Sequence, residues 1–102
     1  MNISFSDLQN KLITAEKMNF VHAAILAADI VNDYSDSAKN AVSNWLQGED
    51  ISAVMIGDAS IADITDELNC TQLQAVCILN AIEKDPEIFA DAVLALWKDE
   101  IR

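Results

Sequence analysis

The chain has no Lys, Arg or His from residue 40 to residue 83. The same stretch carries seven carboxylates: Glu49, Asp50, Asp58, Asp63, Asp66, Glu67 and Glu83. Over the whole chain 17 acidic residues stand against six Lys and Arg, which gives a formal net charge of −11. Binding to nucleic acid or to anionic membranes depends strongly on Lys and Arg. The charge therefore argues against both and favours a partner with a basic surface.

Glycine, proline and cysteine are also scarce, with two, one and two residues. So few turn-forming residues, together with 52% apolar residues, favour helices joined by short connections over a fold with many tight β-turns. A length of 102 residues suits one domain, so we predict a single acidic all-helical domain over residues 1–102. Cys70 and Cys77 would lie about 10 Å apart along a continuous helix, which is too far for a disulfide.

No apolar run is long enough for a membrane span. The most apolar run, residues 20–31, contains His22 and Asp29 and is far shorter than the roughly 20 residues that a span needs. The first residues lack the basic start and the apolar block of a secretory signal. We therefore expect a cytoplasmic protein outside the membrane, and a secreted protein with a non-cleaved signal remains the alternative.

Apolar spacing and capping side chains predict a compact all-α bundle of five or six short helices. The residues that can cap the helix starts are Ser6, Asn19, Ser35 or Asp36, Ser60, Thr71 and Asp85. The predicted helix from Phe20 to about Tyr34 is apolar on nearly all sides, so we place it at the centre of the domain. The last helix should begin at Pro86 and carry apolar residues as far as Ile101.

The large aromatic side chains Trp45, Phe89 and Trp97 are expected to be largely buried against the central helix. Residues 49–59 are the least regular part of the chain and fit a short helical turn, an extended segment or a loop. Because no second strand candidate exists to pair with this segment, we predict no sheet.

Residues 60–82 have the apolar spacing of two short helices around a tight turn. The residues that fit are Ile64 and Leu68 on the first helix, Cys70 in the turn, and Ala75 and Ile78 on the second helix. In this spacing the segment resembles a helix-turn-helix, with Asn69 where Gly is usual. The resemblance implies a DNA reader, with Gln72 and Asn80 facing outward on the second helix, and a transcription regulator is our alternative function. The missing basic residues make direct nucleic-acid binding unexpected.

No pattern of residues indicates an enzyme. Asp63, Asp66 and Glu67 lie within about one helical turn, but no His or further carboxylate stands at a spacing that would complete a metal site or an acid/base pair. His22 is isolated among apolar residues, so we expect it to be partly buried and hydrogen-bonded. We predict no catalytic activity, no metal and no cofactor.

The function that the sequence favours is a small acidic protein-interaction or regulatory module that binds a basic protein partner. Asp63, Asp66 and Glu67 would guide the encounter, and Leu73 and Val76 would supply buried contact if they reach the surface. A nucleic-acid-mimicking inhibitor is a special case of this reading, because spaced carboxylates can occupy a basic binding cleft. The sequence is also compatible with a homodimer.

Overall fold

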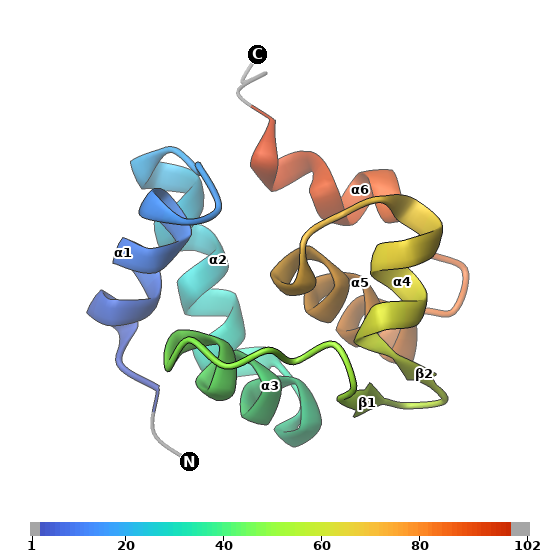
Figure 1. Ribbon diagram of the computed structural model, residues 1–102. Coiled ribbons are helices and arrows are strands. Elements are labelled where there is room, and N and C mark those ends of the chain that lie inside the picture. Colours follow the sequence, from blue (N-terminus) through green and yellow to red (C-terminus); the bar gives the residue numbers. More distant parts are fainter. Residues whose placement is uncertain (1–2, 99–102) are drawn as a thin grey trace.

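The computed structural model describes residues 3–98 and contains six α-helices in that range (Figure 1). The elements are α1 (Phe5–Thr14), α2 (Phe20–Asp33), α3 (Asp36–Leu46), β1 (Met55–Ile56), β2 (Ala59–Ser60), α4 (Ile61–Leu68), α5 (Gln72–Lys84), α6 (Ala90–Leu94) and the 3₁₀ turn η1 (Ala95–Trp97). The predicted all-α class, with a helix-turn-helix-like hairpin in the C-terminal half, is confirmed. The Cα radius of gyration is 12.5 Å, close to the value expected for a compact chain of this length.

Side-chain caps fix most of the helix starts. Each cap accepts a hydrogen bond from the backbone N–H three residues later, and the caps of α2 to α5 are the predicted ones: Asn19, Ser35, Ser60 and Thr71. Helix α1 differs, because Ser4 caps it and Ser6 does not. Ser4 offers the same hydroxyl chemistry two residues earlier, so the helix starts two residues earlier than predicted.

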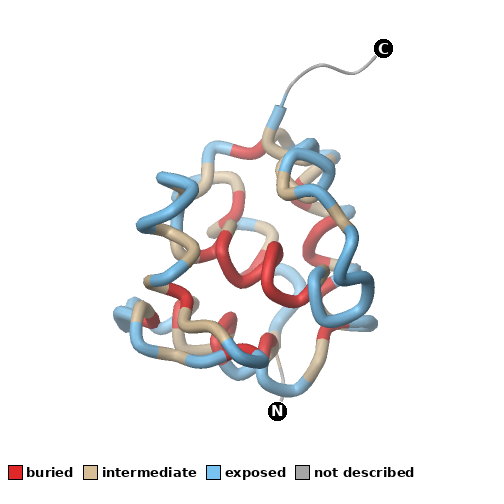
Figure 2. The backbone as a smooth tube through the Cα atoms, turned by 90° about the vertical axis from the view of Figure 1, so that its right-hand side faces the viewer, coloured by how far each residue is buried: buried red, intermediate tan, exposed pale blue. Residues whose placement is uncertain are grey.

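Helix α5, not α2, occupies the centre of the protein. Leu73 and every residue from 75 to 80 are buried, and α5 contacts α3, α4, α6 and β1 (Figure 2). Helix α2 makes its main contacts with only two elements, α1 and η1. Its outer side leaves apolar residues exposed, so the prediction that residues 20–34 form the central helix is wrong.

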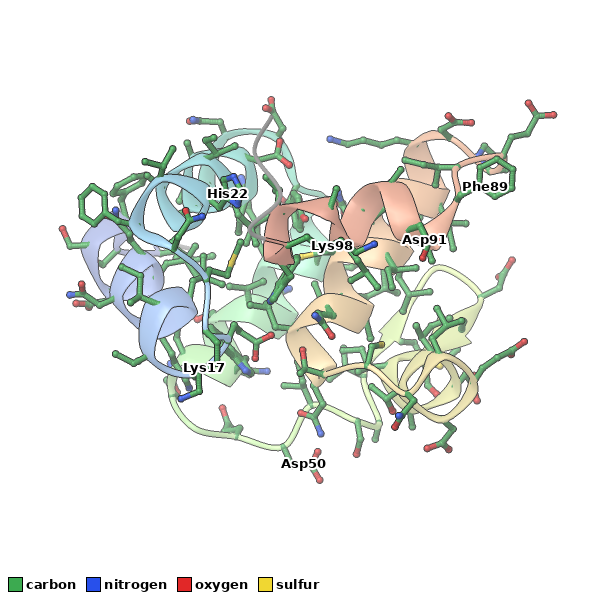
Figure 3. The ribbon with its side chains drawn as sticks, turned by 90° about the horizontal axis from the view of Figure 1, so that it is seen from above. Lys17, His22, Asp50, Phe89, Asp91 and Lys98 are labelled. Carbon is green, nitrogen blue, oxygen red and sulfur yellow. The ribbon has the colours of Figure 1, made fainter. Side chains whose placement is uncertain are left out.

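The three aromatic side chains that were expected in the core differ in how far they are buried. Trp45 is buried as predicted, and the Lys11 ammonium lies 4.4 Å from its ring centroid and donates to its carbonyl. Trp97 is only half-buried, although its indole Nε1 is buried without a hydrogen-bond partner among the described residues. Phe89 is 80% exposed and projects outward before α6, so its predicted burial is wrong (Figure 3).

The exposure of Phe89 follows from the late start of α6. The Ile88 N–H donates to the Asp85 carbonyl at 3.1 Å, and the Glu87 N–H donates to the Asp85 carboxylate at 3.1 Å. These bonds form a turn where a helix was predicted from Pro86, and α6 begins only at Ala90. The predicted apolar position at Ile101 lies outside the described residues.

A two-stranded sheet precedes α4, which corrects the prediction of no sheet. Met55 pairs with Ser60 and Ile56 pairs with Ala59 in antiparallel register. Gly57 in the connecting turn has a φ of +64°, a conformation that glycine adopts without steric cost. Each strand has only two residues, too few to show the alternation by which a strand is recognised in sequence.

Candidate functional site

The hairpin of α4 and α5 is built as its sequence predicts. The Ser60 hydroxyl accepts from the Asp63 N–H at 3.1 Å, and the Asp63 carboxylate accepts from the Ser60 N–H at 3.0 Å. Asn69 ends α4 in the left-handed conformation, with a φ of 53°. Thr71 then caps α5 and forms a second reciprocal pair with Gln74. Two tightly specified ends therefore hold a short turn between the helices.

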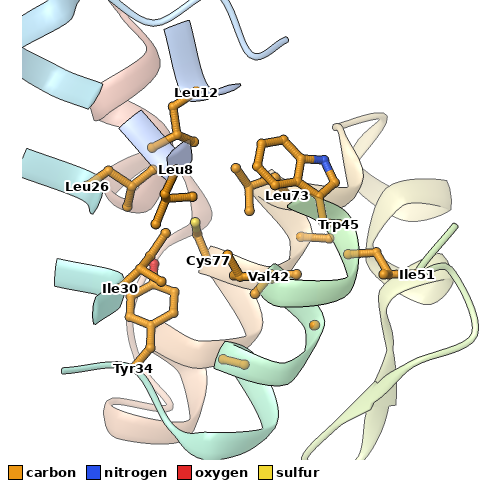
Figure 4. Close-up of a cluster of buried hydrophobic side chains, with 14 of the residues drawn as sticks. Leu8, Leu12, Leu26, Ile30, Tyr34, Val42, Trp45, Ile51, Leu73 and Cys77 are labelled. Carbon is orange, nitrogen blue, oxygen red and sulfur yellow. The ribbon is translucent and has the colours of Figure 1, made fainter. Parts of the chain in front are cut away.

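The outer side of α5 is covered, which corrects one part of the predicted site. Leu73 and Val76 are both 0% exposed, and Leu73 lies beside Trp45 in the core (Figure 4). The physical reason is that α3 and β1 pack against α5, and Trp45 of α3 lies over Leu73. Neither residue can contact a partner in this structure, so the apolar half of the predicted site is lost.

The two amides that could have read bases are already engaged inside the protein. Gln72 accepts from the Ile51 N–H at 3.1 Å and donates to the Asp50 carboxylate at 2.7 Å. Asn80 is buried, and its Oδ1 accepts from the Ser35 N–H at 3.1 Å. These bonds tie α5 to the segment before β1 and to the start of α3.

Asp63, Asp66 and Glu67 are all exposed on α4. Asp63 has a structural role, because its carboxylate completes the helix cap at the positive end of the helix dipole. Asp66 and Glu67 lie in the last turn of α4, where the dipole is negative and acidic side chains are unfavourable. Leu68 follows them and is 43% exposed. The carboxylates of Asp66 and Glu67 therefore do not stabilise α4.

A hollow of about 440 Å³ lies beside α4, between the β1–β2 turn and the C-terminal half of α5. Its apolar lining includes Ile64, Leu79 and Ile82, and Asp58 and Glu83 contribute exposed carboxylates to it. A Cβ placed on Gly57 would lie 3.6 Å from Glu83 Cγ, so the Glu83 side chain lies against the turn. The hollow was not predicted, because half of it is formed by the sheet that the sequence did not reveal.

A second hollow, of about 360 Å³, lies between α2, α5 and α6, and Tyr34 and Cys77 line it together with Asp29. Tyr34 and Cys77 are hydrogen-bonded to each other. Burial raises the pKa of both groups, that of Cys77 to about 12, so both stay protonated at neutral pH. Burial also raises the pKa of Asp29, against the opposing effect of Lys84. A neutral thiol and a neutral phenol offer no activated nucleophile.

His22 has the structural role that was predicted for it. It is partly buried, and its Nδ1 lies 2.9 Å from the Leu96 carbonyl, an acceptor to which the ring N–H donates. The bond attaches the C-terminal turn η1 to α2. His22 therefore does not contribute to the surface of α4.

No helix in residues 3–98 is both long enough and apolar enough to cross a membrane. Within the same range, no three His, Cys, Asp or Glu side chains come together in a group that could hold a metal ion. No protein-family model matches the chain, and no curated protein or solved structure is significantly similar to it.

Proposed function

We propose that this protein is a cytoplasmic interaction module that regulates a basic protein partner by binding it, without catalysis. The observation that carries the proposal is the acidic surface formed by α4 and the neighbouring hollow. Asp66 and Glu67 have no role in the fold, and Asp58 and Glu83 border an apolar hollow. No Lys, Arg or His lies between residues 40 and 83, and Lys84, which follows Glu83, donates to the Asp33 carbonyl at the end of α2.

The hollow replaces Leu73 and Val76 as the source of apolar contact. A Lys or Arg side chain has an apolar stem and a charged head, and the two ends match the two kinds of surface found here. The stem would pack on Ile64 and Ile82, and the head would reach the carboxylates of Asp58 or Glu83. Asp66 and Glu67 would mainly accelerate the encounter through long-range attraction. A nucleic-acid mimic is the special case in which the partner's basic surface is itself a nucleic-acid site.

A helix-turn-helix transcription regulator is the alternative, and the hairpin geometry of α4 and α5 supports it. The engagement of Gln72 and Asn80 within the protein and the burial of Leu73 weigh against it. Submicromolar binding to duplex DNA that weakens as salt is added would favour the alternative over our proposal.

The first experiment is capture of binding proteins from native cell extract by the wild-type protein and by a variant with Asp66→Lys and Glu67→Lys. The matched control carries Asp7→Lys and Asp33→Lys, which change the net charge equally on α1 and α2. For a captured partner, the α4 variant should slow association by about tenfold or more and flatten its dependence on salt. Equal association rates for the α4 variant and the control would mean that only net charge matters.

The second experiment tests the hollow. Ile82→Ser removes apolar lining from a side chain that is already partly exposed, so the fold should tolerate it. The variant should dissociate faster from the captured partner and associate at an unchanged rate. An unchanged dissociation rate would remove the hollow from the site and leave only the acidic face of α4.

A further inference from the structure

The outer side of α2 carries an exposed apolar patch, and α2 and α4 lie on opposite sides of the protein in Figure 1. Phe20 is 69% exposed, Val21 58% and Ile25 51%. The half-buried Ala24 and Ala28 lie on the same side of the helix, between and beyond these larger residues. These five residues, Phe20, Val21, Ala24, Ile25 and Ala28, are called the α2 patch.

Helix α1 extends the α2 patch. The Gln9 side-chain amide donates to the Phe20 carbonyl at 3.5 Å, so α1 runs beside the start of α2. Phe5, one helical turn before Gln9, is 41% exposed and lies on the side of α1 that carries Gln9. The α2 patch contains no charged residue, although the chain has a formal net charge of −11. A basic partner or a nucleic acid therefore gains nothing here, and the matching surface must itself be apolar.

We propose that the α2 patch binds a second copy of this chain, in an antiparallel dimer with a two-fold axis between Ala24 and Ile25. In this register Val21 of one copy faces Ala28 of the other, and Ile25 faces Ala24. Val21 and Ile25 therefore each meet an alanine, and Phe20, which falls opposite Asp29, lies at the end of the contact. A parallel pairing would place large residues against large ones. The antiparallel arrangement also brings helix dipoles of opposite direction together.

The exposed area fits a weak dimer. An aromatic side chain carries about 150–250 Å² and an aliphatic one somewhat less, so the exposed parts of Phe5, Phe20, Val21 and Ile25 amount to about 400 Å² per copy. Two copies with their alanines and neighbouring polar atoms approach the roughly 1,000 Å² that marks the lower end of specific interfaces. We therefore expect a roughly micromolar dissociation constant, and the fraction of dimer should rise with protein concentration.

Sedimentation of the whole chain over a range of micromolar to submillimolar concentrations tests the proposal. The wild type should shift from the 11.2 kDa monomer to twice that mass as the concentration rises. Ile25→Glu places two like charges near the axis and should raise the dimer dissociation constant on the order of 100-fold. The matched control is Met55→Glu, because Met55 is 54% exposed on β1 and lies outside the α2 patch.

Disulfide cross-linking tests the register. In a background with Cys70→Ser, Ile25→Cys should form a covalent dimer on mild oxidation, because the two thiols lie close to the axis, and Asn40→Cys on α3 should not. A wild type that stays monomeric at every concentration would overturn the proposal. A dimer that Ile25→Glu leaves intact, or that Met55→Glu breaks equally, would also overturn it. Cross-linking through Asn40→Cys in preference to Ile25→Cys would assign the dimer to another face.

Discussion

The substitution Leu73→Ala tests whether Leu73 is a core residue, as in this structure, or a surface residue that contacts a partner. Leu73 is 0% exposed at the start of the central helix α5 and lies beside Trp45. Truncation of a buried Leu to Ala typically costs about 2–5 kcal/mol, because transfer free energy is lost and a cavity remains. A surface Leu would cost less than about 1 kcal/mol.

The expected loss is large compared with the total stability. Domains of this size usually unfold with a free energy of about 5–15 kcal/mol. A loss of about 3 kcal/mol should lower the Tm by roughly 12–24 °C, at about 4–8 °C for each kcal/mol. The assay is chemical and thermal unfolding followed by circular dichroism. The matched control is Leu68→Ala, which truncates the same side chain at an exposed position of the same hairpin.

Equal losses in the free energy of unfolding for Leu73→Ala and Leu68→Ala would contradict the buried position of Leu73. A second contradictory result would be a Leu73→Ala variant that keeps its stability and dissociates faster from a captured partner. That second result would mean that α5 turns its Leu73 side outward in solution, and it would restore the apolar half of the site that the sequence predicted.

Three further predictions concern groups whose pKa the fold shifts. Burial raises the pKa of Asp29 in the folded protein, so its carboxyl group supports the fold only while it is protonated, and this support is lost as the pH rises through the folded pKa. Asp29→Asn should therefore raise the free energy of unfolding at pH 7 and leave it unchanged near pH 3, below the unfolded pKa of about 3.9. The Ser52 N–H and the Gln72 amide lower the pKa of Asp50, so the stability that its carboxylate contributes is present above the unfolded pKa and lost as the pH falls through the folded pKa. Denaturant titrations should therefore show a lower free energy of unfolding for Asp50→Ala than for the wild type at pH 7, and a smaller difference in acid. Burial raises the pKa of the Cys77 thiol to about 12, so a thiol reagent at pH 8 should label the half-buried Cys70 first and reach Cys77 only when denaturant unfolds the chain; equal labelling rates in the native protein would contradict this structure.

The parts of the fold that the sequence predicted well depend on contacts between near neighbours. Ser60 and Asp63 cap each other across three residues, and Asn69 needs only its own side chain to accept the left-handed conformation. Such signals can be recognised without knowledge of the tertiary structure. The exposure of Asp66 and Glu67 was equally predictable, because unpaired carboxylates are rarely buried.

The parts that could not be predicted depend on which elements pack together. Residues 20–34 and 72–84 both contain long apolar stretches, and the sequence does not show that the second packs against four other elements and the first mainly against two. Phe89 has the spacing of a core residue, but the Asp85 turn delays the start of α6 and leaves its side chain outside. The hollow beside α4 joins the turn at Gly57 to Glu83, which are too far apart in sequence for a local pattern to connect them.

The late position of α5 in the chain has a consequence for biosynthesis. The ribosome releases α1, α2 and α3 before residues 73–80, which fill the centre of the finished protein. Until then Leu8, Leu12 and Val42 lack a large part of the surface that covers them in the completed core. A nascent chain that stops before Gln72 should therefore expose apolar surface and attract chaperones or proteases. Native structure should form only after residues 73–80 have emerged from the ribosome.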